Sequence, residues 1–381
     1  MALGHAVTVV AERFEGQSES ETRFGIHILR PVSRGLLHAW VLSNAHRLVQ
    51  QYDVDVIIGD LSKIVPWGQK SLGGRPLVSV VRHFNGRAIF SEAMFPAPPV
   101  LWAIERATPL FLRSSEIVTE SRTTAAIAER LGARGARISL VPPGVDPARY
   151  HPDPSARSPT PLVVYVGRLK RYKRIDLALR AFAILRRSRP EAQFHIAGGG
   201  SDQPRLVALA DSLALNGSVR FLGTPPTEEV VALYQRAWVH LQPSSAEGWG
   251  LTALEAMACG TPVVAFRGGA LPETVGPLCS DLMADVPTAA SLAKALERGL
   301  ARPEVGDSEA AGRLVEYARR FTWDATAAGY ATVLGAAVRR FARPTPALFP
   351  SLFGRARPGF GTRPTRSEST ERAGADRAGS G

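Results

Sequence analysis

The sequence predicts an α/β protein with two halves, each a doubly wound parallel sheet, and three observations lead to that fold class. Short apolar runs alternate with segments whose apolar residues recur at helical spacing. Glycine-rich turns follow several of the apolar runs, and one proline-rich stretch divides the pattern in two. Strands separated by helices need crossover connections, which produce parallel sheets covered by helices. The length of 381 residues suits two such domains.

The second half shows the alternation most clearly. The apolar run Leu162–Val166 is typical of a buried parallel strand, and Gly167 ends it. Ile175–Arg187 follows with the periodicity of a helix. Further strands are expected at Gln193–Ala197, Val219–Leu222, Val239–Gln242 and Pro262–Phe266, and further helices at Arg205–Ala214, Glu228–Ala237 and Leu251–Cys259.

The first half repeats this alternation less regularly. Strands are expected at Ala6–Val10, His27–Leu29, Asp55–Ile58, Leu77–Val81, Glu116–Thr119 and Ile138–Val141. Helices are expected around Leu37–Gln50, Pro99–Arg113 and Thr123–Leu131, between several of these strands.

The start of the chain departs from the usual order of a doubly wound domain, which begins with a central strand, a glycine-rich turn and a helix. Here Ala2-Leu3-Gly4-His5 reads as a helix end and a glycine stop, directly before the strand Ala6–Val10. We therefore expect the first half, as written, to lack its first strand and glycine loop. We also expect the natural protein to begin upstream of Met1.

Composition shifts set the expected domain boundaries. The stretch Val141–Pro161 contains seven prolines and is typical of a connection between domains. The two domains are therefore expected at residues 1–150 and 151–341. Proline, glycine, arginine and serine dominate residues 342–381, so a disordered basic tail is expected there.

The net charge is strongly positive. The chain has 46 Lys and Arg against 34 Asp and Glu, which gives +12. A basic surface favours nucleic acid, anionic lipid or phosphorylated substrates. Because no pattern of stacking aromatics or a recognition helix is present, we expect no nucleic-acid binding.

The sequence predicts neither secretion nor a membrane span. No apolar stretch is long enough to cross a bilayer, and the N-terminus lacks a signal-peptide pattern. Two cysteines exclude a disulfide framework and a four-cysteine zinc site, so a cytoplasmic protein is expected.

The apolar residues of Pro99–Leu112, together with the net charge, add the hypothesis of peripheral contact at the inner face of the plasma membrane. The alternative is an ordinary core helix.

Two glutamates stand out beside the expected helix Leu251–Cys259. Glu255 is the only charged residue of this apolar helix, and an isolated buried carboxylate needs a partner. That partner is either a structural arginine or the hydroxyl groups of a ligand. Glu247 precedes the helix N-terminus, which favours anions and polar ligands. The glycines Gly248 and Gly250 on either side of Trp249 allow a ligand close to the backbone.

Basic residues follow the first strand of the second half. Arg168 and Lys173 come after Gly167, at the strand end that lines the ligand crevice of an open α/β sheet. An arginine there offers a fixed pair of donors to phosphate oxygens, and the lysine adds a second positive charge. His83, which follows the strand Leu77–Val81, is expected to face the same crevice.

These motifs resemble the retaining glycosyltransferases of group 1, family 4, which have the two-domain GT-B fold. Gly167-Arg168-Leu169-x-x-x-Lys173 matches the family's Gly-Arg-Leu-x-x-x-Lys, and Glu247-x₇-Glu255 matches its paired-glutamate motif. Gly268-Gly269-x-x-Pro272-Glu273 matches its glycine turn. Val141–Asp146 stands where the family has Pro-Asn-Gly-Val-Asp, with Pro143 as a departure. The match is close from Leu162 to Val275 and looser across Ala2–Tyr150.

The resemblance implies a role for each matched residue. Arg168 and Lys173 would hold the diphosphate of a nucleotide-sugar and stabilise the leaving group, and Glu255 would bind the ribose hydroxyls. Glu247 would contact the donor hexose near the reacting carbon, and His83 would contact the sugar from the first domain. The expected donor site also includes Gly167, Gly198, Gly248, Trp249, Gly250 and Leu251.

The resemblance also implies a reaction. The protein is expected to transfer a hexose, without metal or cofactor, from a nucleotide-sugar to the hydroxyl of a glycan, lipid-linked or small-molecule acceptor in glycan biosynthesis. One alternative is a truncated or non-catalytic homologue that binds nucleotide-sugar. Another is a different GT-B enzyme such as an epimerase, against which the Gly-Arg-Leu and paired-glutamate motifs argue.

Overall fold

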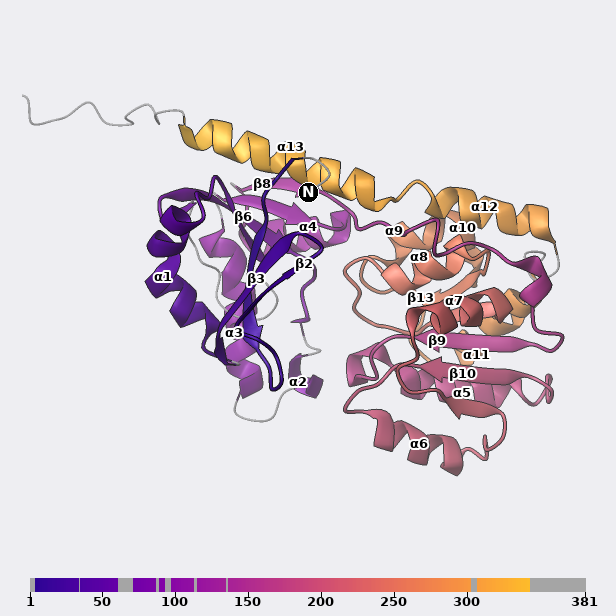
Figure 1. Ribbon diagram of the computed structural model, residues 1–381. Helices are drawn as coiled ribbons and strands as arrows, with labels where there is room; N and C mark the ends of the chain where they lie inside the picture. Colours follow the sequence, from indigo (N-terminus) through magenta and orange to yellow (C-terminus); the bar gives the residue numbers. More distant parts are fainter. Residues whose placement is uncertain are drawn as a thin grey trace, which may run out of the picture. The chain divides into compact units, whose positions relative to one another are not determined.

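Helices and strands alternate through most of the chain, as the sequence predicts (Figure 1). The computed structural model describes residues 4–33, 35–60, 71–86, 89–92, 97–112, 115–134, 136–302 and 307–342. The predicted tail, residues 342–381, lies outside this range apart from Ala342.

A six-stranded parallel sheet forms the centre of the second half, in the order β11-β10-β9-β12-β13-β14. Its strands are β9 (Leu162–Val166), β10 (Gln193–Ala197), β11 (Val219–Phe221), β12 (Val239–Gln242), β13 (Val263–Phe266) and β14 (Met283–Ala284). The predicted strands are confirmed, and β14 adds one that the sequence analysis did not identify. Because the strand order reverses at β9, helices cover both faces of the sheet, and the apolar runs are buried.

Two groups of helices pack around this sheet. In one group α5 (Ile175–Leu185) contacts α6 (Gln203–Ser212) and α11 (Ala289–Leu300). In the other, α8 (Leu251–Ala258) contacts α7 (Thr227–Arg236) and α12 (Ser308–Ala318). The short helices α9 (Leu271–Thr274) and α10 (Gly276–Cys279) follow β13. Sheet and helices share one continuous apolar core.

The first half is divided between two sheets. One contains β1 (Thr8–Arg13), β3 (Ile26–Ser33) and β2 (Ser20–Arg23), in that order. The other contains β4 (Ile57–Asp60), β6 (Arg75–Val81), β7 (Glu116–Thr119) and β8 (Arg137–Leu140), all parallel, with β5 (Ser71–Leu72) beside β6. The helices are α1 (Leu37–Gln51), α2 (Ile89–Glu92), α3 (Ala97–Phe111) and α4 (Arg122–Arg130).

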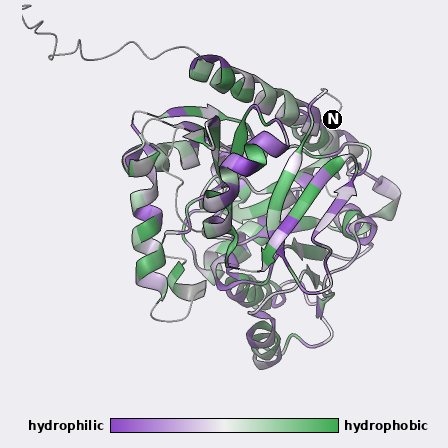
Figure 2. Ribbon diagram, turned by 60° about the vertical axis from the view of Figure 1, so that its left-hand side comes forward, coloured by the Kyte–Doolittle hydropathy of each residue, from purple (hydrophilic) through white to green (hydrophobic). Residues whose placement is uncertain are grey.

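The first sheet corrects the expectation of a purely parallel arrangement. β1 pairs with β3 in parallel, but β2 pairs with β3 antiparallel, as a hairpin. β2 was not predicted because Ser-Glu-Thr-Arg has no apolar alternation, and all four residues are exposed. The strands of this sheet carry hydrophilic as well as hydrophobic residues (Figure 2).

β1 and β4 are each the last strand of their sheet. Val9 of β1 is 41% exposed and Ile58 of β4 is 49% exposed, although both strands contain apolar runs. A strand placed upstream of Met1 stays a prediction.

The last helix of the described chain, α13 (Trp323–Ala342), packs against the first half. Val333 and Ala337 of α13 share a buried cluster with Val78 and Val80 of β6, and Figure 1 shows the helix running beside β6 and β8. The sequence analysis assigned residues 323–341 to the second domain, but their packing joins them to the first-half sheet.

Two segments connect the halves and run side by side. The Val145 N–H donates to the Phe321 carbonyl at 2.9 Å, and the Thr326 hydroxyl donates to the Pro142 carbonyl at 2.8 Å. A Cβ on Gly144 would lie 2.1 Å from the Thr322 carbonyl carbon, so only glycine fits there. The glycine of the Pro-Pro-Gly-Val-Asp segment thus permits this close backbone contact.

Candidate active site

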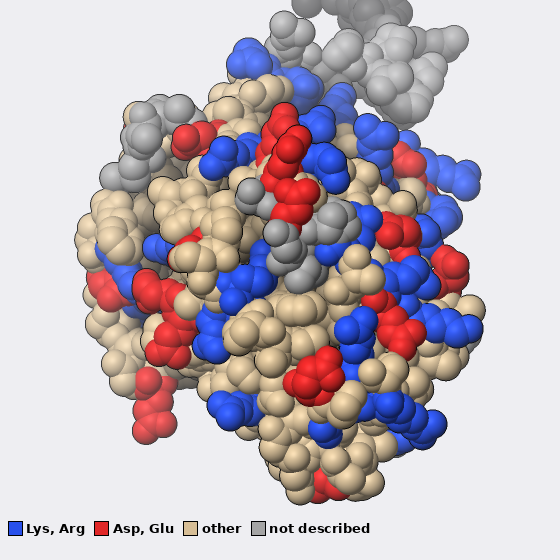
Figure 3. All heavy atoms as spheres, turned by 90° about the vertical axis from the view of Figure 1, so that its right-hand side faces the viewer, with Lys and Arg blue, Asp and Glu red and all other residues tan. Residues whose placement is uncertain are grey.

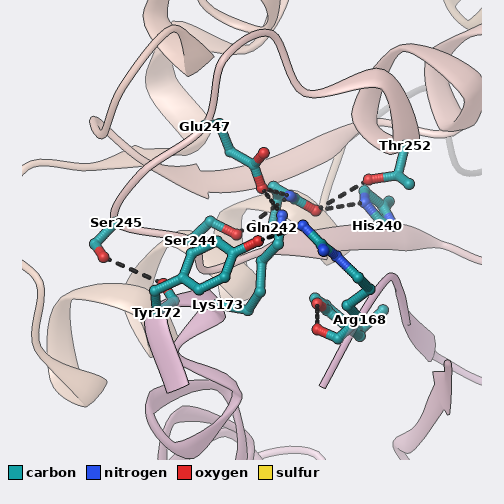
Figure 4. Close-up of polar contacts among 10 residues, drawn as sticks. Arg168, Tyr172, Lys173, His240, Gln242, Ser244, Ser245, Glu247 and Thr252 are labelled. Atoms are coloured by element: carbon teal, nitrogen blue, oxygen red, sulfur yellow. Dashed lines mark hydrogen bonds and ion pairs between the residues drawn. The ribbon is translucent and has the colours of Figure 1, made fainter. Parts of the chain in front are cut away.

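A lysine and a glutamate from two predicted motifs meet at the carboxyl ends of the second-half strands. Lys173 ends the 3₁₀ helix η3 (Arg171–Lys173) after β9, and Glu247 lies between β12 and α8. The Lys173 Nζ is 2.5 Å from Glu247 Oε1, with side chains 13% and 12% exposed. Figure 4 shows this pair among the polar residues around it. The structure therefore brings together two residues that are 74 positions apart.

Arg168 lies on the same loop, with its side chain turned to a tyrosine. Its Nη2 donates to the Tyr172 hydroxyl at 2.9 Å, and its carbonyl accepts from the Tyr165 hydroxyl at 3.0 Å. Arg168 is exposed, and Tyr172 is anchored in turn because its carbonyl accepts from the Ser245 N–H at 3.3 Å. The guanidinium is thus accessible to a ligand next to Lys173.

Gln242, the last residue of β12, reaches the same glutamate. Its Nε2 donates to Glu247 Oε1 at 2.6 Å and to the Ser244 hydroxyl at 3.3 Å. Its Oε1 accepts from the Thr252 hydroxyl at 3.3 Å and lies 3.2 Å from His240 Nε2. The sequence analysis treated Gln242 only as a strand end. Polar residues in an otherwise apolar buried run were the available signal.

His83 approaches this cluster from the first half. A Cβ on Gly248 would lie 2.3 Å from the Arg82 carbonyl oxygen and 3.2 Å from the His83 Cβ, so the two loops are in close contact. Burial lowers the pKa of His83, while Glu247 and Asn85 act in the opposite direction. The structure therefore places His83 beside Glu247, as the sequence predicts.

The loop after His83 is held by Glu105 of α3. Glu105 Oε1 accepts from the Asn85 N–H at 2.5 Å, and Oε2 accepts from the Gly86 N–H at 2.6 Å. These bonds explain a charged residue within the apolar run Pro99–Leu112, since the carboxylate binds backbone donors of the histidine loop.

Glu255, the second glutamate of the motif, has different partners. The Tyr234 hydroxyl donates to its Oε2 at 3.1 Å, and Tyr150 is a second hydrogen-bond partner. Burial raises the pKa of Glu255 to about 7, although both tyrosine bonds act to lower it. The expected partner of this carboxylate is thus found inside the protein as tyrosine hydroxyls, rather than as an arginine.

The glycines of the motifs bring loop backbones together. Gly198 has φ +135°, and a Cβ there would lie 1.9 Å from the Gly167 carbonyl oxygen. Gly269, with φ +56°, would place a Cβ 2.4 Å from the Glu247 carbonyl oxygen. Both positions require glycine for close backbone contact. The Gly268-Gly269 turn therefore supports the backbone of Glu247, which accepts from the Ala270 N–H at 2.9 Å.

Trp249 and its neighbours start α8. Gly250 is the N-cap with φ +97°, and Leu251 is the first helical residue. The Trp249 ring is 6% exposed and meets Phe321 edge-on, with centroids 5.2 Å apart. The Trp249 side chain therefore packs against the connection between the halves, and its backbone carbonyl accepts from the Thr274 hydroxyl at 2.5 Å.

Among the residues that the structure describes, no three His, Cys, Asp or Glu side chains are grouped as metal ligands. Metal independence stays a prediction. None of the helices in the described ranges combines the length and apolar character that crossing a membrane requires.

Two known protein families match the chain, and their matches meet within its proline-rich connection. Residues 148–321 match the family described as glycosyl transferases group 1, and residues 1–149 match glycosyltransferase family 4. The D-inositol 3-phosphate glycosyltransferase of Salinispora arenicola is 32% identical, over 78% of this chain and 72% of that protein. A GDP-mannose-dependent alpha-(1-6)-phosphatidylinositol monomannoside mannosyltransferase of Mycolicibacterium smegmatis is 30% identical, over 71% and 75%. Other curated relatives are matched over about half of their length, such as 54% for the Corynebacterium jeikeium protein.

Solved structures show the same fold. Sucrose-phosphate synthase from Thermosynechococcus elongatus superposes with a TM-score of 0.74 and 23% identity, over 89% of this chain and 90% of that chain. HepE of Anabaena, in complex with UDP and glucose, gives 0.64 and 18%, over 82% and 86%. The fold and these matches define a glycosyltransferase of the GT-B type, which confirms the predicted fold class. Within that class, the chain belongs to the group 1 glycosyltransferases, family 4.

Proposed function

We propose that this glycosyltransferase transfers a hexose from a nucleotide-sugar to an acceptor hydroxyl with retention of anomeric configuration. The observation that carries the proposal is the convergence of Lys173, Glu247 and His83, which come from three separate segments of the sequence. Family membership supports the reaction class, and the UDP held by the structural neighbour HepE supports a nucleotide donor.

Arg168 and Lys173 would bind the donor diphosphate. Cleavage of the bond between sugar and phosphate develops negative charge on the diphosphate, which fixed cations stabilise. Both side chains lie after β9, where ligands of open α/β sheets bind. Lys173 would exchange its contact with Glu247 for the phosphate oxygens, and Arg168 would turn from Tyr172.

Glu247 and His83 would face the hexose. The contacts of Glu247 with Lys173 and Gln242 both use Oε1, so Oε2 would accept from a sugar hydroxyl. Burial favours the neutral imidazole of His83, which both donates and accepts hydrogen bonds. Glu255 would accept from the ribose hydroxyls in addition to its two tyrosines, since a carboxylate offers about four acceptor positions.

The acceptor is proposed by analogy with the relatives. The names of the Salinispora and Mycolicibacterium proteins refer to inositol phosphate and to a phosphatidylinositol mannoside, and both carry a phosphate. We extend this to an inositol-type acceptor, free or lipid-linked, for this chain. The net charge of +12 fits a phosphorylated acceptor, and Figure 3 shows basic side chains interspersed with acidic ones on one face.

Contact with a membrane surface belongs to the same proposal. Val100 and Leu110 of α3 are 59% and 45% exposed, so part of this helix is not covered by the core. Binding to anionic vesicles that disappears at high salt would support the peripheral role, and absence of binding at low salt would contradict it.

The test identifies the donor nucleotide-sugar first and then measures how an Arg168 substitution changes nucleotide binding. Incubation with a panel of UDP- and GDP-sugars and inositol phosphates should identify a donor by product formation or by protection against unfolding. Arg168→Ala should then weaken nucleoside-diphosphate binding by about 1.5–3 kcal/mol, the scale of hydrogen bonds to charged groups. Arg171→Ala is the matched control, because Arg171 lies on the same loop, 61% exposed and close to Asp202. Equal calorimetric affinities for the two variants would contradict the diphosphate assignment.

A further inference from the structure

A buried glutamine lies behind the Lys173–Glu247 pair, and none of the roles above accounts for it. Gln242 is 2% exposed at the end of β12, in the middle of the six-stranded sheet. The adjacent strands β9 and β13 end on Val166 and Phe266. Burying an amide is unfavourable unless it is hydrogen-bonded, so an amide at this position requires partners inside the protein.

The amide of Gln242 uses its full hydrogen-bonding capacity. Its two N–H groups donate to Ser244 and Glu247, and its oxygen faces Thr252 and His240. The reverse orientation would place the amide oxygen against the Glu247 carboxylate, and repulsion disfavours it. The network therefore determines which end of the amide faces Glu247.

His240 is compatible with this orientation. Since the amide oxygen can only accept, His240 Nε2 must carry the proton, and the buried Nδ1 has no partner among the described residues. Burial lowers the pKa of His240 to about 4, so the imidazole is neutral at physiological pH. A neutral histidine and a threonine thus hold the glutamine from behind.

Lys173 and Gln242 both donate to Oε1 of Glu247. During the proposed reaction only Gln242 would stay bound to this oxygen. Lys173 is the cation that would turn to the donor diphosphate, whereas Gln242 is locked by Thr252, His240 and Ser244. We propose that Gln242 is a positioning residue that keeps the Glu247 carboxylate directed at the hexose after Lys173 has moved to the diphosphate. This inference rests on the proposed function.

The principal test is Gln242→Leu, which keeps the approximate volume and removes the donor. Glu247 should lose its position when the donor sugar is bound, so kcat should fall by about 10- to 100-fold, the factor that corresponds to one hydrogen bond to a charged group. Affinity for the nucleoside diphosphate alone should stay within about twofold, because Lys173 and Arg168 are unchanged. A merely structural glutamine would not separate these two quantities.

Two further variants guard against a general folding effect. Thr252→Val removes one bond that orients the amide and should lower kcat in the same direction but less, whereas Thr252→Ser should restore it. Gln235→Leu is the matched control, because Gln235 is also buried, at 8% exposed, and donates to the His151 carbonyl at 2.9 Å. It should reduce thermal stability and leave the ratio of kcat to nucleoside-diphosphate affinity unchanged.

Two results would overturn the inference: an unchanged kcat in Gln242→Leu, or an equal loss of kcat and of nucleoside-diphosphate affinity. If the wild-type protein neither transfers sugar nor binds a nucleotide-sugar, the proposed function fails instead. Crystal structures of Lys173→Ala with and without Gln242→Leu then decide the positioning role alone, because Lys173 holds Glu247 in neither. A Glu247 side chain displaced only in the double variant would support the role, and one that is unmoved in both would contradict it.

Discussion

The two halves of the protein differ in how completely they bury their sheets. In the second half, six parallel strands form one sheet inside one continuous core, and Val163, Val164 and Tyr165 of β9 are fully buried. The first half has two smaller sheets, and every residue of β1 is at least partly accessible. The first-half sheet around β6 also relies on α13, which arrives from the far end of the chain.

This difference coincides with a division of labour at the candidate site. Gln242 and Glu247 are held by the well-buried half, so this part of the proposed donor site is organised before a ligand binds, whereas Lys173 and Arg168 would change partners. Preorganised charges stabilise a transition state without further rearrangement. His83 comes from the less buried half, and its loop is held by the single carboxylate of Glu105.

Substitution of one leucine in each half tests this difference in burial. Leu179 of α5 is fully buried, and Leu42 of α1 is 51% exposed. Leu179→Ala should lower the free energy of unfolding by about 2–5 kcal/mol, the usual cost of a cavity in a core, whereas Leu42→Ala should cost less than about 1 kcal/mol. Denaturant unfolding of both variants checks this. Similar losses would show that the first half is as tightly packed as the second.

A carboxyl group in the second half should make stability depend on pH. The folded pKa of Glu255 is raised to about 7 from an ordinary value of 4.5, so the folded state favours the protonated form. The associated stability is present below pH 4.5 and is lost as the pH rises to about 7. The expected loss is roughly 3 kcal/mol at most.

Thermal unfolding of the wild type and of Glu255→Gln between pH 5 and 8 measures this effect. The variant should lack the decline, because an amide does not titrate. Parallel curves would assign the pH dependence to other groups. If Glu255→Gln keeps its stability but weakens nucleotide binding, the ribose role is supported. A loss of stability without any change in nucleotide binding would identify a structural carboxylate.

A smaller effect on stability is expected at a contact between the two halves. Glu273 of α9 accepts from the Arg122 N–H at 2.8 Å and from the Thr123 N–H at 2.6 Å, at the N-terminus of α4. Glu273→Gln should cost about 1 kcal/mol, as the loss of a helix cap does. It should also separate the unfolding of the two halves in calorimetry. Glu229→Gln, at an exposed position in the first turn of α7, is the control. Identical transitions in both variants would contradict a linking role for Glu273.

Local sequence patterns predicted the fold of the second half and the main candidate residues of the site. Strands such as Leu162–Val166 are continuous apolar runs, which local periodicity identifies because both faces of a parallel sheet are buried. Arg168, Lys173 and Glu247 occur in motifs of fixed spacing at strand and helix ends, so a local pattern was sufficient to find them. The proximity of His83 also followed, because the carboxyl ends of parallel strands line one crevice.

Local sequence patterns could not predict the features that depend on contacts between distant segments. The polar strand Ser20–Arg23 forms because β3 pairs with it, and no periodicity marks it. Residues 323–342 return to the first half because the apolar side chains of α13 complete its core. Glu255 acquires its tyrosine partners from other segments, and its burial raises its pKa to about 7. Local patterns report propensity and burial, whereas hydrogen-bond partners and pKa values depend on which distant side chains the fold brings together.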